Sequence, residues 1–164
     1  MSVIALQLAM DHLRAEDDDS ELVQAYLDAA EEAAVAFLQR RFYADAAALA
    51  LAQTGIAEQR HALITRYQER VRAGSGSMYM PLPGMADQTR QRLANLEDQF
   101  LEDLAQLAAV EHGMVINAAI QTACLLTLGH LYNNREDSII GVSVVALPLG
   151  SRTFLAPYRR GLGL

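Results

Sequence analysis

The chain has 164 residues, of which 52% are hydrophobic, so it can bury one core and we expect a single domain over residues 1–164. Its formal net charge of -7 argues against a nucleic-acid reader or a membrane-surface binder, because both present basic patches to phosphate groups. All thirteen basic residues are arginine, which excludes Schiff-base chemistry and a P-loop phosphate lysine.

The N-terminal part of the sequence predicts two helices separated by an acidic run. A short amphipathic helix over residues 3–14 is followed by "AEDDDSE", in which Asp19 or Ser20 is the expected N-cap of the next helix. An acidic run could also hold a divalent cation, but the EF-hand pattern is missing. The second helix, 21–42, has an apolar stripe opposite a polar face. That polar face consists of Asp28, Glu31, Glu32 and Gln39.

Residues 45–112 predict an inserted helical hairpin. An alanine-rich connector, "ADAAALALAQTG", precedes two amphipathic segments at 56–72 and 88–110, whose apolar stripes can bury one another in an antiparallel pair. We expect this hairpin to be peripheral to the core. Glycines, serines and prolines exclude a helix between the two segments. An apolar loop of this kind meets a partner or folds back onto its own domain, and its candidate contact residues are Met78, Tyr79, Met80 and Leu82.

The last third of the chain predicts a central helix and a non-helical tail. The segment 114–137 is apolar around most of its circumference, so we expect it at the centre of the bundle or at a subunit interface. In the tail, 138–164, β-branched residues are punctuated by glycine and proline, which predicts an extended arm or a short β-hairpin. The fold class expected overall is all-α, a small antiparallel bundle with an inserted hairpin and this C-terminal arm.

The sequence contains no recognisable catalytic or metal-binding constellation. Glu58 and His61 form one E-x-x-H pair, but a di-iron bundle needs a second pair and two further glutamates. His130 is most simply interpreted as a satisfied interior or interface histidine. The single cysteine, Cys124, excludes an internal disulfide and lies in an apolar helix, where we expect an inert thiol. We therefore expect no enzyme activity, no metal and no cofactor.

No secretory signal or membrane span is expected from the sequence. The N-terminus lacks a basic segment and a cleavage site, and polar residues interrupt the longest apolar helix. The charge is uneven, with ten acids and three arginines in residues 1–45 but two acids and four arginines in residues 113–164. These two regions would attract one another within a subunit or between neighbouring subunits. We expect a soluble protein made in the cytoplasm, with no membrane partner.

Three segments resemble a known family of structural proteins. The helix "ELVQAYLDAAEEAAVAFLQRRF", the helix "IQTACLLTLGHLYNNRE" and the tail "LPLGSRTFLAPYRR" are, in this order, similar to the head–tail connector (adaptor) family of long-tailed, siphovirus-type bacteriophages. The most specific part is the ending "L-P-x-G…L-x-P-Y-R" after "H-x-Y-x-N-R-E". The resemblance covers residues 3–43 and 114–160. The hairpin at 45–112 is longer than compact members carry, and Asn117 stands where many members have proline.

The resemblance implies a ring subunit at the virion neck, made in the host bacterial cytoplasm. Family members assemble as cyclic homo-oligomers, typically of twelve subunits, between the portal protein and the stopper or tail-completion protein. Double-stranded DNA passes through the ring without sequence-specific binding, and an acidic ring would be non-adhesive toward DNA phosphate. The alternatives left open are a small helical metal- or cofactor-binding bundle and a regulatory phage protein.

The same resemblance implies an interface in the C-terminal third of the chain. In the family this region docks to the portal, so we expect the arm to be loosely held in the free subunit and to become ordered on assembly. The candidate portal or subunit contacts are His130, Tyr132, Asn134, Arg135, Leu147, Pro148, Leu149, Phe154, Leu155, Pro157, Tyr158 and Arg159.

Overall fold

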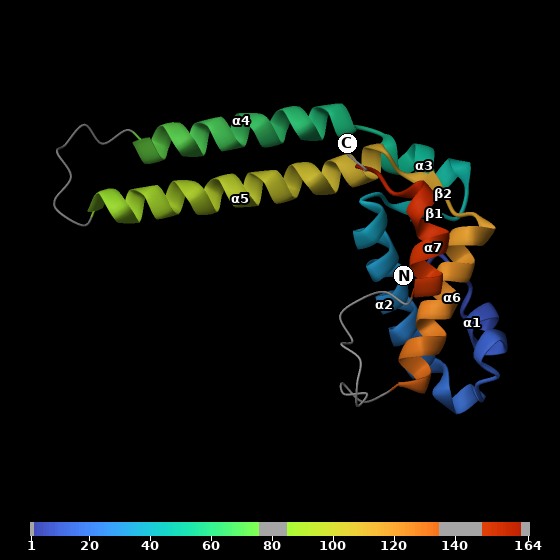
Figure 1. Ribbon diagram of the computed structural model, residues 1–164. Helices are drawn as coiled ribbons and strands as arrows, with labels where there is room; N and C mark the ends of the chain where they lie inside the picture. The colour runs from blue at the N-terminus through green and yellow to red at the C-terminus, as the bar shows by residue number, and fades with distance from the viewer. Residues whose placement is uncertain (1, 76–84, 135–148, 162–164) are drawn as a thin grey trace. The chain divides into compact units, whose positions relative to one another are not determined.

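The computed structural model describes residues 2–75, 85–134 and 149–161, and it is predominantly helical (Figure 1). The all-α class predicted from the sequence is therefore confirmed. The chain divides into two compact units, one formed by Met1–Leu51 with His112–Leu164 and the other by Ala52–Glu111. The second unit falls within the segment that the sequence sets apart as an inserted hairpin.

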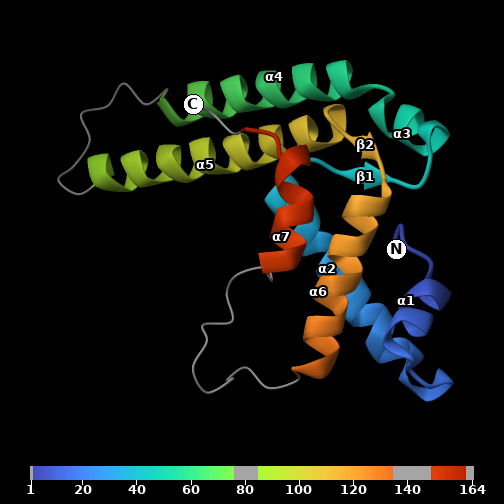
Figure 2. The same ribbon diagram turned by 45° about the vertical axis from the view of Figure 1, so that its right-hand side comes forward.

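The first unit is a small helical bundle built around two neighbouring helices. Its helices and strands are α1 (Leu6–Leu13), η1 (Asp17–Asp19), α2 (Ser20–Leu38), β1 (Phe42–Tyr43), most of α3 (Ala46–Gln53), β2 (Met114–Val115), α6 (Ala118–Asn133), α7 (Leu149–Leu155) and η2 (Ala156–Tyr158). Helices α2 and α6 pack side by side, and α1 and α7 each contact both of them (Figures 1 and 2). The buried core draws on α1, α2, α6 and α7, including Leu27, Leu38, Ile120, Leu128 and Leu155.

Helix α6 contacts α1, α2 and α7, and a side-chain cap marks its start. The Asn117 side chain accepts a hydrogen bond from the backbone N–H of Ile120 at 3.0 Å, which satisfies one of the free amides of the first turn. Met114 and Val115 precede this cap as a strand, pairing in parallel with Phe42 and Tyr43. The sequence analysis missed both strands, because two-residue strands are too short to show a period of two.

The second unit contains two long helices, α4 (Ile56–Ser75) and α5 (Met85–Glu111), which pack against each other. The rings of Tyr67 and Phe100 stack between them, with centroids 4.2 Å apart. Arg60 forms a salt bridge to Glu111. These contacts hold one helix of the unit to the other.

The structure corrects the expectation for Glu31 and adds detail at the alanine-rich connector and at Asp19. The alanine-rich connector contains a helix, α3 (Ala46–Gln53), because alanine and leucine favour helix and the Asp45 carboxylate caps it by accepting from the N–H of Ala48 at 2.8 Å. Glu31, assigned to the polar face of α2, is only 8% exposed. Asp19 occupies the N-cap position of α2, as expected, but its carboxylate makes no capping hydrogen bond and instead accepts one from the Tyr132 hydroxyl at 2.6 Å.

The expectation of an extended C-terminal arm was also wrong for the part of it that the structure describes. Leu149–Leu155 form helix α7 and Ala156–Tyr158 a 3-10 turn. Pro157 lies in the first residues of that turn, where a missing N–H costs nothing. Gly150 lies within this helix, which is only seven residues long. A helix this short depends on its packing against α6, and not on the helix propensity of its residues. Residues 138–148 of the arm lie outside the described residues.

Among the described residues, no helix has the length and apolar character required to cross a membrane.

Candidate interaction surface

Helix α7 is attached to the bundle by buried contacts with α6. Leu155 and Ser151 are fully buried. The hydroxyls of Ser151 and Thr127 form a hydrogen bond at 3.0 Å, and Thr127 Oγ1 also donates to the Ala123 carbonyl at 2.9 Å. Because both buried hydroxyls have partners, the polar pair fixes how α7 sits on α6 without an unsatisfied group. Buried contacts therefore attach the arm to the bundle over residues 149–158.

The outer side of this contact presents large apolar side chains to solvent. Leu149 is 84% exposed, Phe154 43% and Leu126 of α6 38%. A Cβ added at Gly150 would lie 3.7 Å from Leu126 Cδ1, and Phe154 follows Gly150 by one helical turn, so Leu126 and Phe154 lie near the same side of α7. Leu149 is the exposed first residue of the helix. We call Leu126, Leu149 and Phe154 the apolar α7 face. Exposed apolar side chains that cluster in this way mark a contact surface more often than scattered ones do.

Arginines line another side of the same arm. The guanidinium groups of Arg152 and Arg159 lie 5.6 Å and 5.1 Å from the ring centroid of Phe37, within the range of a cation–π contact. The backbone N–H of Arg160 donates to the Leu38 carbonyl at 2.9 Å, which ties the end of the arm to the end of α2. The described part of the arm carries these three arginines and no acidic residue.

The candidate interface residues at the end of α6 make hydrogen bonds within the subunit. Tyr132 reaches Asp19 as described above, and Asn134 Nδ2 donates to the His130 carbonyl at 2.8 Å. His130, Tyr132 and Asn134 are half-buried. The structure thus brings Leu149 and Phe154 to the surface and places Leu155 in the core. Pro157 is exposed, whereas Tyr158 and Arg159 are half-buried. Arg135, Leu147, Pro148, Met78, Tyr79, Met80 and Leu82 lie outside the described residues.

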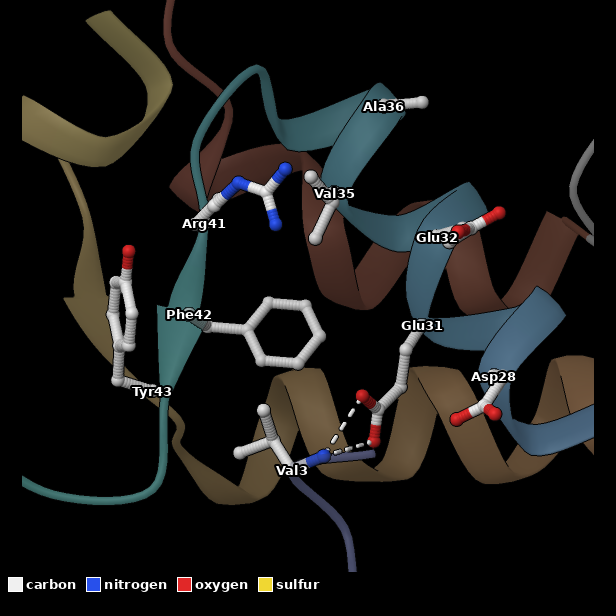
Figure 3. A pocket seen from close by; sticks show the side chains of 9 residues that line it. All are labelled: Val3, Asp28, Glu31, Glu32, Val35, Ala36, Arg41, Phe42 and Tyr43. Carbon is white, nitrogen blue, oxygen red and sulfur yellow. Dashed lines mark hydrogen bonds between the residues drawn. The ribbon is translucent and has the colours of Figure 1, made fainter. Parts of the chain in front are cut away.

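Sequence reasoning missed the part played by Glu31. Its carboxylate accepts hydrogen bonds from the backbone N–H of Val3, at 3.0 Å and 2.9 Å to its two oxygens (Figure 3). It also accepts one from the backbone N–H of Ile4 at 2.8 Å. Burial raises the pKa of Glu31, and the nearby Asp28 charge acts in the same direction, whereas the two amides lower it. A signal was present in the sequence, because Glu31 follows Leu27 by four positions and so shares its buried face.

Glu31 lies beside an open cleft of about 670 Å³ in the first unit (Figure 3). The cleft is lined by Val3, Asp28, Glu31, Glu32, Val35, Ala36, Arg41, Phe42 and Tyr43. Both oxygens of Glu31 are occupied by the N-terminal amides, so this carboxylate positions the chain and is not a free base.

The residues considered for chemistry are dispersed. Glu58 and His61 are exposed on α4. Within residues 2–75, 85–134 and 149–161, no three His, Cys, Asp or Glu side chains gather in a group that could hold a metal ion. Cys124 is fully buried, and burial raises the pKa of its thiol to about 12, with the Glu31 charge as a second cause.

Comparisons of the chain with models of protein families, with curated proteins and with solved structures found no match.

Proposed function

We propose that this chain is a structural head–tail connector subunit of a long-tailed bacteriophage, which forms a ring under the portal and leaves a channel for double-stranded DNA. The proposal begins with the three segments that resemble the connector family. The observation that carries it further is the apolar α7 face, where Leu149 and Phe154 are exposed on a helix whose other side is fully buried. A helix held this firmly can present an apolar surface to a partner with little loss of conformational entropy on binding.

The charge distribution supports attachment to an acidic partner. Arg152, Arg159 and Arg160 lie in the arm, whereas Asp17, Asp18 and Asp19 form η1 at the start of α2. In a closed ring each subunit offers two different surfaces to its neighbours, so an acidic and a basic surface on one chain fit a cyclic assembly. Contacts of this kind would weaken as the salt concentration rises.

The proposal is tested by mixing the full chain with the portal protein of the same phage. We expect a co-migrating complex and ring-shaped particles in negative-stain images, with weaker complex formation at high salt. A chain that remains monomeric alone at high concentration and also when mixed with the portal contradicts the proposal.

Two leucine variants test whether the apolar α7 face makes the contact. Leu126→Ala should weaken portal binding about tenfold, which is typical for a truncated apolar side chain at an interface. Leu8→Ala is the matched control, because Leu8 on α1 is 38% exposed, as Leu126 is. Equal losses of binding in the two variants would show that the apolar α7 face is not the contact.

A further inference from the structure

The apolar seam between α4 and α5 is only partly covered by the two helices themselves. In the described part of the second unit, Ile56 is the one buried apolar side chain. Seam residues such as Leu63, Tyr67, Leu96 and Phe100 remain half-buried. When two helices pack together, each covers only part of the other's apolar stripe. In a helical bundle, further helices cover the rest of this apolar surface.

One open side of this seam forms a shallow groove. Its floor consists of Leu63, Tyr67, Leu96 and Phe100, with Arg66 and Arg70 along the α4 rim and Gln99 and Asp103 along the α5 rim. The groove has a volume of about 40 Å³, far below the roughly 300 Å³ at which small-molecule sites begin. A groove of this size and composition suits the side chains of another helix.

The charges of α4 and α5 indicate which helix would occupy the groove. Helix α4 carries four arginines and two glutamates, whereas α5 carries six acidic residues and two arginines. Between two copies of the chain, α4 against α4 or α5 against α5 would place like charges together. The pairing of α4 from one copy with α5 from the other brings opposite charges together.

We propose that this groove binds the hairpin of a second copy of the chain, with the acidic α5 of that copy lying along the Arg66 and Arg70 rim of α4. The same α4 to α5 contact arises whether two copies pair or a ring closes. This contact involves neither the apolar α7 face nor a portal. A negative result for the contact would therefore not contradict the proposed function, and the reverse is also true.

Charge reversal in the full chain tests the contact. Arg66→Glu with Arg70→Glu makes both helices acidic. Glu102→Arg with Asp103→Arg replaces two of the six acidic residues of α5 by arginine, one at the groove rim and one beside it. Each double variant should self-associate about tenfold or more weakly than the unaltered chain, as measured by sedimentation velocity over a concentration series. An equimolar mixture of the two should regain association, because each α4 to α5 contact then joins opposite charges.

The matched control is Glu58→Arg with Glu69→Arg, which makes the same charge change as the α5 variant but at exposed positions of α4 outside the groove. This control should associate at least as well as the unaltered chain, and circular dichroism should show unchanged helicity in all variants. Three results would overturn the proposal: an unaltered chain that is monomeric throughout, since another occupant would then cover the groove; groove variants that associate normally; or a mixture that stays monomeric while both variants keep their helicity.

Discussion

Glu31 fixes the N-terminal segment to the bundle through two backbone amides. Glu31→Ala should lower the free energy of unfolding by about 2–4 kcal/mol, because the N–H groups of Val3 and Ile4 lose a charged acceptor in a buried setting. Urea unfolding measures the change. Glu32→Ala is the control, since Glu32 is the next residue and exposed, and it should change stability by less than about 0.5 kcal/mol. Equal effects would mean that the contact contributes little.

The same carboxylate makes stability depend on pH. Burial raises the pKa of Glu31 above its ordinary 4.5, so the folded chain binds this proton more tightly than the unfolded chain does. Its contribution is fully present below the ordinary pKa and is lost as the pH rises through the raised one. As the pH rises from about 4.5 toward neutrality, the chain should therefore lose stability relative to Glu31→Gln, which cannot ionise. A constant difference over this range would contradict the assignment.

Cys124 is expected to be inert in the folded chain. With the pKa of its thiol raised to about 12 by burial, almost no thiolate is present near neutral pH, and the sulfur is shielded from reagents. Iodoacetamide at about pH 8 should leave the folded chain unlabelled and should label it fully in denaturant. Rapid labelling without denaturant would show that α6 opens readily.

Helix α7, seven residues long, has one side packed in the core and another side exposed to solvent. Leu155→Ala should cost about 2–5 kcal/mol, because it opens a cavity beside α6 in a fully packed core. Leu149→Ala should change stability by less than about 0.5 kcal/mol, since Leu149 is 84% exposed. Thermal and urea unfolding of the two variants compare them directly. A large cost for Leu149→Ala would mean that its exposed position is not maintained in solution.

For the molecule as a whole, the first unit should fold without the hairpin. The hydrophobic core cluster consists of residues from the first unit, and none of the described residues of Ala52–Glu111 belongs to it. Replacing residues 56–110 with a short Gly/Ser linker should leave a helical protein that unfolds cooperatively in urea, as followed by circular dichroism. Loss of cooperative unfolding would show that the hairpin is part of the folding core.

The sequence by itself determined the helical class and the positions of the long helices. Apolar residues recurring every three and four positions mark α2, α4 and α5 directly, because this period follows from helix geometry alone. The helix α6, which is apolar around most of its circumference, packs against α1, α2 and α7. The separate character of the hairpin was visible in its own pair of stripes. These properties are local, so a short window of sequence contains them.

Only the tertiary structure decided which partners the short elements and the buried polar side chains contact. The burial of Glu31 depends on amides twenty-seven and twenty-eight positions away, and the pairing of Phe42 with Met114 joins still more distant residues. Helix α7 is too short to be stable alone, and it is held by Leu155 and by the Ser151–Thr127 hydrogen bond. A window of sequence around each residue cannot show these partners, because the fold alone brings them together.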